Sequence, residues 1–136
     1  MTATQMNTTR LAPAAEAIFD GFGPALREAL SANVAAAIAE DVGTGDRTGL
    51  LIPADRLARA RVIVREHAVL CGTPWFDACM RAVDPTLRVT WRQHEGDRMA
   101  PDSVVCEIEG PARSLLTAER PSLNFLQLLS GVATAT

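Results

Sequence analysis

The residue best suited to chemistry is Arg120, which stands between Glu119 and Pro121 near the start of a long apolar run. A guanidinium is the side chain best shaped to hold a carboxylate or phosphate through two parallel hydrogen bonds. If a helix begins just before Arg120, the positive end of its dipole adds to this charge and favours a bound anion. The alternative is that Arg120 pairs with Glu119 or another carboxylate at the surface, as lone arginines commonly do.

The run from Leu115 to Thr136 predicts the helix that would present Arg120. Its apolar side chains recur at gaps of three and four, with further apolar positions between them, so we expect burial on several sides. Thr117 is the expected N-cap, and Ser130-Gly131 is expected to end the helix. Pro121 is tolerated there because a first-turn N–H often has no partner.

Composition narrows the class of function. The 136 residues suggest one domain, or one domain plus a fragment. All 13 cationic side chains are arginine, so no residue can form a Schiff base. A net charge of −3 without a basic stripe argues against a nucleic-acid partner. Neither a membrane-spanning run nor a secretory signal is present, so we expect a cytoplasmic protein without a membrane partner.

The cysteines and histidines predict no metal site. Cys71, Cys79 and Cys106 are widely spaced, form no C-x-x-C and lie in apolar settings, which favours buried small hydrophobes in a reducing compartment. His67 and His94 have no partner at metal-ligand spacing.

The elements before Arg120 predict an α+β fold. Residues 1–24 are expected to form a flexible tail, followed by a surface helix over 25–39 with a narrow apolar stripe. A second helix is expected over 75–83, and alternation predicts strands over 60–66, 68–71, 87–91 and 104–108. We expect a small, mainly antiparallel open sheet with flanking helices, whose second face needs a cover from outside this chain.

A glycine-rich segment from Glu40 to Thr48 is expected to form a structured turn after the first helix. Its glycines interrupt the helix, and Asp41 and Asp46 can cap turn N–H groups. The ligand spacing of an EF-hand and the lysine of a P-loop are both missing.

Several segments resemble quinolinate phosphoribosyltransferase, also called nicotinate-nucleotide pyrophosphorylase (carboxylating), in the same order along the chain. They are AEDVGTGDRT (39–48), VLCG (69–72), EGD (95–97), LLTAER (115–120), LNFL (123–126) and SGVAT (130–134). The resemblance covers about residues 25 to 136. This sequence departs from the family at Pro121 and at Gly49, where the family more often has threonine.

The resemblance implies a domain division and a reaction. Residues 25–116 would form an N-terminal, hammerhead-like α/β domain, and 117–136 would form the helix and start of a C-terminal α/β barrel absent from this chain. The full-length family joins quinolinate to phosphoribosyl pyrophosphate, giving nicotinate mononucleotide, pyrophosphate and CO2 for NAD biosynthesis. Mg²⁺ accompanies phosphoribosyl pyrophosphate and is bound mainly by the barrel.

The resemblance also implies roles for residues near the final motif. Arg120 would reach into a neighbouring subunit's site and contact a quinolinate carboxylate, so a homo-oligomer is expected, a dimer before a hexamer. Glu119 is expected to orient Arg120 or cap the helix, and Asn124 to bond backbone. No catalytic residue is expected in this chain, and no role is assigned to four residues: Thr134, Thr136, Asp41 and Asp46.

Two other functions stay open on the sequence. One is a non-catalytic, free-standing interaction domain. The other is a related transferase-like protein associated with molybdate transport, which the TAER sequence at 117–120 disfavours. In either case the apolar final helix and an uncovered sheet face predict a patch through which copies of the chain associate.

Overall fold

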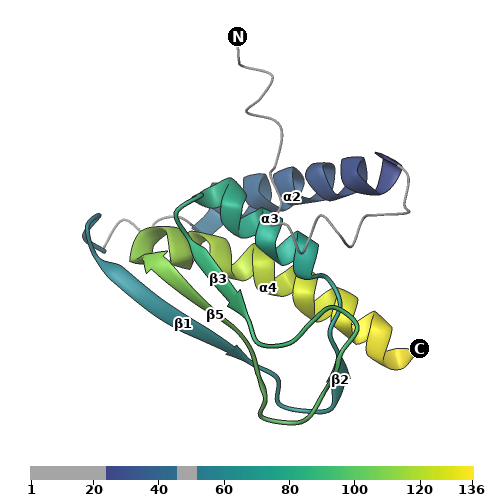
Figure 1. Ribbon diagram of the computed structural model, residues 1–136. Coiled ribbons are helices and arrows are strands. Elements are labelled where there is room, and N and C mark those ends of the chain that lie inside the picture. Colours follow the sequence, from purple (N-terminus) through teal and green to yellow (C-terminus); the bar gives the residue numbers. More distant parts are fainter. Residues whose placement is uncertain (1–23, 46–51) are drawn as a thin grey trace.

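The computed structural model describes residues 24–45 and 52–136 and has the predicted α+β architecture (Figure 1). The elements in chain order are α2 (Pro24–Gly45), β1 (Leu57–Ile63), β2 (Ala68–Val69), α3 (Thr73–Val83), β3 (Arg88–Trp91), β4 (Arg98–Met99), β5 (Val104–Pro111) and α4 (Ala112–Ala135). Of the tail predicted over residues 1–24, all but Pro24 lies outside the described residues.

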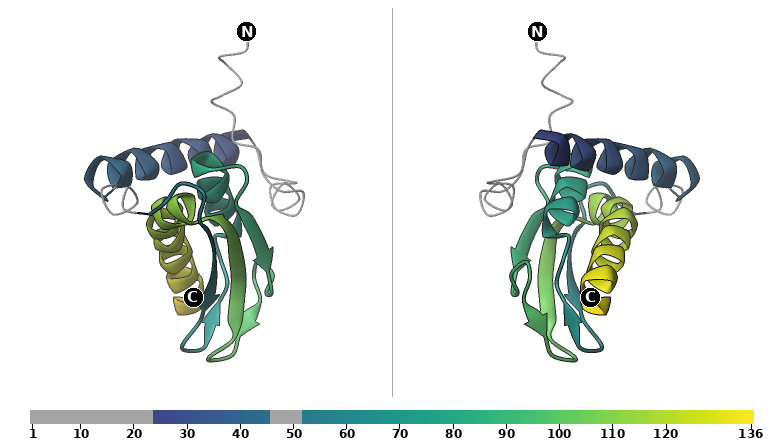
Figure 2. Two further views of the ribbon diagram at one scale, coloured as in Figure 1. Left: turned by 90° about the vertical axis from the view of Figure 1, so that its left-hand side faces the viewer. Right: turned by 90° about the vertical axis from the view of Figure 1, so that its right-hand side faces the viewer.

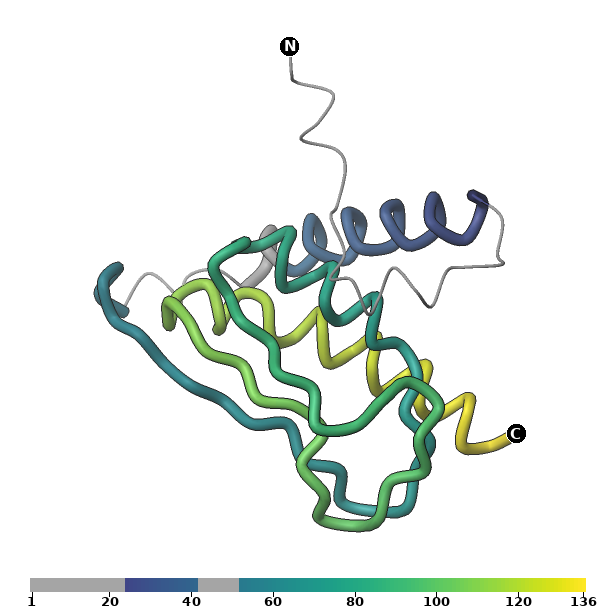
Figure 3. Tube along the Cα trace, in the orientation of Figure 1, coloured from purple at the N-terminus to yellow at the C-terminus, as the bar shows by residue number. Residues whose placement is uncertain are grey.

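The described strands form two small antiparallel sheets. β5 lies between β1 and β3 in one sheet, and β2 pairs with β4 in the other. The chain bends sharply between β1 and β2 (Figure 3). The three-stranded sheet contains the strand before this bend, and the two-stranded sheet contains the strand after it. β1 begins three residues earlier than predicted, because its pairing with β5 starts at Leu57 opposite Pro111. β4 was not predicted, since two residues are too few to show an alternating pattern.

Side chains alternate across the three-stranded sheet as the sequence predicted. The inward positions contribute Cys106 and Ile108 to the core, whereas most of the outward positions are charged, as at Arg59, Arg61, Arg88, Glu107 and Glu109. Arg59 pairs with Glu109 at 3.0 Å. Our expectation that the uncovered sheet face adds to an apolar patch is therefore wrong, because that face presents charges to solvent.

Helices α3 and α4 cover the inward face (Figure 2). The main core lies between them and the sheet. Its most buried large side chains are Leu70, Phe76, Met80 and Ile108.

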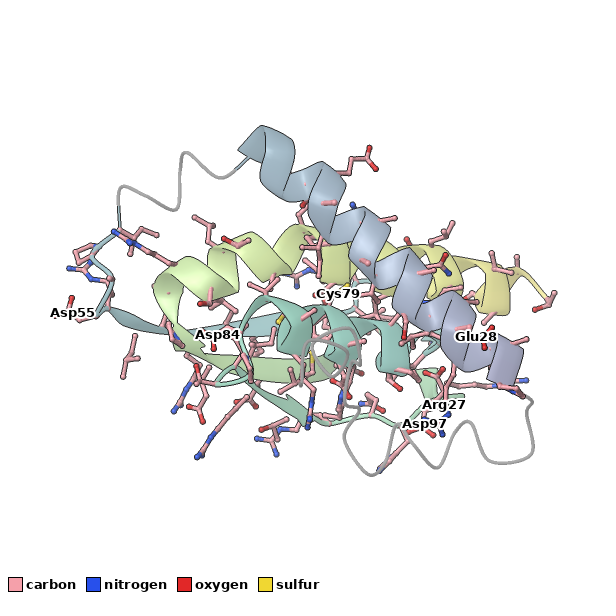
Figure 4. The ribbon with its side chains drawn as sticks, turned by 90° about the horizontal axis from the view of Figure 1, so that it is seen from above. Arg27, Glu28, Asp55, Cys79, Asp84 and Asp97 are labelled. Atoms are coloured by element: carbon pink, nitrogen blue, oxygen red, sulfur yellow. The ribbon has the colours of Figure 1, made fainter. Side chains whose placement is uncertain are left out.

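Helix α2 packs across α3 and α4 as seen from above (Figure 4). Its predicted stripe is confirmed, because Leu30 and Val34 are buried against Ala78 and Cys79 of α3. The predicted end at Ala39 is wrong, since the helix continues to Gly45 and takes in most of the segment expected to be a turn. α2 contacts both α3 and α4, and tertiary contacts of this kind outweigh the low helix propensity of glycine, about 1 kcal/mol per residue. Asp46 lies outside the described residues.

Both predicted ends of the final helix are wrong. α4 begins at Ala112 and not at Thr117, whose hydroxyl donates to the carbonyl of Arg113 inside the helix. The helix also runs past Ser130 and Gly131 to Ala135. The first turn forms because Ala112 and Leu115 are buried against the sheet, so packing extends the helix on the N-terminal side of the expected cap. Pro121 consequently lies inside the helix.

Candidate functional site

Arg120 lies in the third turn of α4 with its side chain exposed to solvent. Its guanidinium makes no ion pair or hydrogen bond with any residue of 24–45 or 52–136, so the alternative of a surface pair with Glu119 is not observed. The dipole argument is wrong, because the positive end of α4 lies at Ala112 and its effect is confined to the first turn. Within the part of the chain that the structure describes, the site is therefore an exposed guanidinium on a helix face without an ion pair.

The helix face around Arg120 is polar. Residues four and seven positions later share that face, and these are Asn124 and Gln127, both exposed. Asn124 makes no hydrogen bond within the described part of the chain, so its expected bond to backbone stays a prediction. We expected burial of α4 on several sides, but this side of the helix is exposed. It presents an outward stripe with one cation and two amides.

Glu119 does not act as a helix cap. It is half-buried in the interior of α4, far from the first turn, and makes no ion pair among the residues described. That Glu119 orients Arg120 stays a prediction, because no ion pair or hydrogen bond joins the two side chains.

Beside the polar stripe, α4 exposes two large apolar side chains. Leu128 is 65% exposed and Val132 is 59% exposed, one helical turn apart. Leu128 also lines a pocket of about 230 Å³ between α2 and α4, together with Pro121 and Asn124. An apolar surface therefore adjoins the face that carries Arg120.

Hydrogen bonds hold the N-terminal end of α4. The hydroxyl of Ser114 donates to Asp84 Oδ2 at 2.6 Å, and Thr86 donates to Asp84 Oδ1 through its N–H and its hydroxyl. These bonds, from Ser114 first, hold the pKa of Asp84 below its usual value. Figure 4 shows Asp84 just past the end of α3, where it ties that helix to α4.

The C-terminal turns of α4 are held by two hydroxyls that contact β2 and the residues after it. Ser130 Oγ accepts from the N–H of Cys71 at 3.0 Å, and Thr134 Oγ1 accepts from the N–H of Val69 at 2.9 Å. No role was predicted for Thr134. A pair of hydroxyls spaced by one helical turn, near the end of an otherwise apolar helix, is the signal that could have suggested this contact.

The start of α3 is capped from a distance. Both carboxylate oxygens of Glu95 accept backbone N–H groups there, from Gly72 at 2.9 Å and from Thr73 at 3.1 Å. Gly72 has a φ of 104°, and a Cβ on it would lie 2.9 Å from Leu129 Cδ1. The VLCG and EGD segments therefore meet at one junction, where only glycine lets α4 pack so closely.

A buried carboxyl group, Asp77, was missed by the sequence analysis. It is 7% exposed and accepts a hydrogen bond from Trp91 Nε1 at 3.0 Å, while Trp91 packs edge-on against Phe76. Burial raises the pKa of Asp77 to about 6, although the Trp91 hydrogen bond and the charge of Arg81 lower it. Because this group lies in the core, we assign it to stability and not to catalysis.

Two cysteines confirm the interpretation as buried hydrophobes. Cys79 and Cys106 are fully buried and free, and burial raises the pKa of each thiol to about 12. Cys79 lies beneath α2 (Figure 4). Cys71 is half-buried, with a pKa raised chiefly by burial. Neither buried thiol is suited to act as a nucleophile at neutral pH.

The described residues do not themselves fit a metal site. Among them, no three His, Cys, Asp or Glu side chains lie close enough together to hold an ion. No described helix is long and apolar enough to cross a membrane.

Comparisons with known proteins place these features in a family. A sequence profile of the quinolinate phosphoribosyl transferase N-terminal domain matches residues 43–130. The chain is 37% identical over 109 residues to the chloroplastic nicotinate-nucleotide pyrophosphorylase (carboxylating) of Arabidopsis thaliana, covering 79% of this chain and 31% of that protein. It is 32% identical over 97 residues to a probable nicotinate-nucleotide pyrophosphorylase (carboxylating) of Bacillus subtilis, covering 71% and 34%.

Solved structures agree with the sequence comparison. The nicotinate-nucleotide pyrophosphorylase of Francisella tularensis superposes with a TM-score of 0.71 at 38% identity, covering 74% of this chain and 36% of that one. NadC of Streptococcus pyogenes superposes with a TM-score of 0.74 at 32% identity, covering 83% and 40%. The chain spans about a third of the length of the curated relatives above. The motif resemblance is confirmed, and the chain belongs to the quinolinate phosphoribosyl transferase N-terminal domain family.

Proposed function

We propose that this chain is the N-terminal part of a quinolinate phosphoribosyltransferase. The observation that supports the proposal most directly is the guanidinium of Arg120, which is exposed and has no ion pair with residues 24–45 or 52–136, in a chain of this family. The reaction joins quinolinate to phosphoribosyl pyrophosphate and contributes nicotinate mononucleotide to NAD biosynthesis. The pyridine nitrogen attacks the anomeric carbon of the ribose, pyrophosphate leaves, and a carboxyl group is lost as CO2.

Arg120 would contribute binding energy to this reaction from a neighbouring subunit. Its side chain projects from an outward face of α4, away from the core of its own domain, so a ligand it holds must lie outside this fold. A planar guanidinium can hold a carboxylate of quinolinate through two N–H groups. Because Arg120 has no partner in the described chain, no ion pair has to be broken first.

The chemical step would be carried by groups that are not among the described residues. No catalytic residue is proposed here, and Mg²⁺ would accompany phosphoribosyl pyrophosphate, where it stabilises charge on the leaving pyrophosphate. The described residues form no metal cluster that could take over that role.

The test is an assay of the polypeptide encoded by the complete gene, with quinolinate and phosphoribosyl pyrophosphate as substrates and nicotinate mononucleotide as the measured product. We expect turnover by that polypeptide and none by residues 1–136 alone. If the complete gene product makes no nicotinate mononucleotide, the alternatives return: a free-standing interaction domain, or the molybdate-associated relative.

We also propose that the chain forms a homo-oligomer, with a dimer expected before a hexamer. The support is the apolar pair Leu128 and Val132, which adjoins the Arg120 face and is too exposed to stabilise its own domain. Replacing both by glutamate should shift the molar mass from light scattering to that of a monomer. The control is Leu57→Glu at the 76% exposed Leu57 of β1, which should leave the mass unchanged. A wild-type chain that is already monomeric contradicts the proposal.

The cytoplasmic location stays a prediction. The plant relatives bear names that place them in chloroplasts or mitochondria, so the family includes members of more than one compartment.

A further inference from the structure

The residues from Val69 to Cys71 form hydrogen bonds on both sides, and on one side the partner is a helix. The N–H of Leu70 donates to the carbonyl of Asp97 at 2.9 Å, and the carbonyl of Leu70 accepts from Gly96 at 2.7 Å. The N–H groups of Val69 and Cys71 point the other way, toward α4. Alternate backbone groups thus serve the β4 side and the α4 side, as in a strand with two neighbours.

Two hydroxyls of α4 take the place of a second neighbouring strand. Thr134 Oγ1 accepts from Val69 and donates to the carbonyl of Ser130 at 2.6 Å. Ser130 Oγ accepts from the N–H of Cys71 and donates back to the carbonyl of Cys71 at 3.0 Å. Each hydroxyl therefore both donates and accepts a hydrogen bond. Each accepts from a backbone N–H of residues 69–71, whose position is set by the pairing with the β4 side.

The spacing of the two hydroxyls along α4 matches the spacing of the two N–H groups along the strand, and this match fixes the position of the helix. Four residues of α-helix rise about 6 Å, and two residues of a strand extend about 6.7 Å. The hydroxyls of Ser130 and Thr134 can therefore both accept from the N–H groups of Cys71 and Val69. They do so together at only one axial position and one rotation of α4. A slip of one residue would turn the helix by about 100° and break both bonds. Close packing of Leu129 on Gly72 reinforces the same setting.

Pro121 leaves one gap in the backbone hydrogen bonds of α4. Proline has no N–H, so the bond from residue 121 to the carbonyl of Thr117 is missing. Arg120 lies within this span, one residue before Pro121. α4 is nevertheless one continuous helix from Ala112 to Ala135, so a rotation of its C-terminal turns also turns Arg120.

We propose that Ser130 and Thr134 are positioning residues for Arg120: their hydrogen bonds to the backbone of Val69 and Cys71 set the rotation of α4 and thereby the direction in which the Arg120 guanidinium points. The inference rests on the proposed function, in which Arg120 binds a carboxylate of quinolinate in a neighbouring subunit. Two-point binding by a guanidinium depends on its orientation, so a small rotation weakens quinolinate binding before it affects folding.

The test uses steady-state kinetics of the polypeptide encoded by the complete gene. Thr134→Val removes the hydroxyl while keeping the shape of the side chain. We expect the KM for quinolinate to rise about tenfold, the scale on which small misplacements of binding groups act. The kcat and the KM for phosphoribosyl pyrophosphate should stay within about twofold of wild type. Thr134→Ser, which keeps the hydroxyl, should restore the KM for quinolinate.

A double-mutant cycle separates positioning from general loosening of the fold. If Thr134 acts through Arg120, then Thr134→Val causes no further rise in the KM for quinolinate when Arg120 is already alanine. Ser114→Ala is the matched control. It also removes a hydroxyl bond that anchors α4, but this bond lies at the N-terminal end of the helix and joins it to Asp84 and not to Val69 or Cys71, so the KM for quinolinate should stay unchanged.

Three kinetic outcomes would contradict the inference, and they distinguish its failure from that of the proposed function. A tenfold rise that persists in the Arg120→Ala background, or that Ser114→Ala reproduces, overturns the positioning role. A wild-type KM in Thr134→Val, alongside a raised KM in Arg120→Ala, overturns the inference and leaves the proposed function intact. An unchanged KM in Arg120→Ala overturns both. Ser130→Ala gives a second variant with the same expectation if Thr134→Val folds poorly, as judged from its urea midpoint.

Discussion

Arg120→Ala is expected to raise the KM for quinolinate about 100-fold in the polypeptide encoded by the complete gene. Loss of a charged, two-point contact costs about 2–5 kcal/mol, and each 1.4 kcal/mol corresponds to a tenfold change in affinity. The KM for phosphoribosyl pyrophosphate should change little, because the proposed contact is with the dicarboxylate alone. Arg120→Lys should restore only part of the loss, since an ammonium group keeps the charge but lacks the planar fork.

The matched control for this experiment is Arg98→Ala. Arg98 is also an exposed arginine without an ion pair among the described residues, but it lies on β4 and not on the α4 face. Its removal changes the net charge by the same amount and should leave both KM values unchanged. Wild-type quinolinate kinetics in Arg120→Lys would show that geometry at this position is unimportant, and equal effects of the two alanine variants would reduce the role of Arg120 to charge.

The second large effect concerns the pH dependence of stability through Asp77. Its pKa is about 6 in the folded chain against an ordinary value of 3.8, and it is buried beside Trp91. The folded state therefore holds this proton more tightly than the unfolded state does. The stabilisation is full below about pH 4 and is lost as the pH rises through 6. The two pKa values differ by an amount worth about 3 kcal/mol of unfolding free energy.

Asp77→Asn isolates this contribution. Asparagine can still accept the Trp91 hydrogen bond but does not ionise, so the variant should gain about 3 kcal/mol relative to wild type between pH 4 and pH 7.5. Urea unfolding followed by circular dichroism at several pH values measures the difference. Asp84→Asn is the control of opposite sign: the lowered pKa of Asp84 gives stability that is lost at acid pH, so that variant should lose its deficit as the pH falls. A constant difference between Asp77→Asn and wild type across this range contradicts the prediction.

Local patterns predicted the parts of this fold that depend on local physics. The alternation that places Cys106 and Ile108 inward is visible in the sequence because successive strand residues face opposite sides. The stripe of α2 at Leu30 and Val34 follows in the same way from helical periodicity. These signals need no knowledge of what packs against them.

The ends of the helices could not be predicted from local rules. Thr117 is a good N-cap by composition, yet burial of Ala112 and Leu115 extends α4 by five residues before it. Gly131 is a common helix terminator, but the hydrogen bonds of Ser130 and Thr134 stabilise the turns on both sides of it. In both places tertiary contacts outweigh propensities of about 1 kcal/mol per residue.

Arg120 was chosen as the candidate site residue by a physical argument that does not hold. Arg120 was singled out for its supposed place in a first helical turn, and the structure puts it in the third. The family resemblance pointed to the same side chain independently. Its guanidinium is exposed and has no ion pair among the residues that the structure describes, so Arg120 remains the best candidate. The bonds of Ser130 and Thr134 to the backbone of Cys71 and Val69, and the distant cap at Glu95, could not be foreseen, because they join residues far apart in sequence.

The hydrogen bonds from the backbone of Val69 and Cys71 to the hydroxyls of Thr134 and Ser130 have a consequence for fibril formation. An open strand edge is a template on which other molecules add strands, and here the α4 side of that strand is already occupied by side-chain oxygens. The outer strands of the three-stranded sheet, β1 and β3, carry the charges of Arg59, Arg61 and Arg88. These charges disfavour edge-to-edge pairing with a strand of another molecule. Copies of the chain should therefore meet through helix surfaces, and concentrated solutions should stay free of cross-β aggregates.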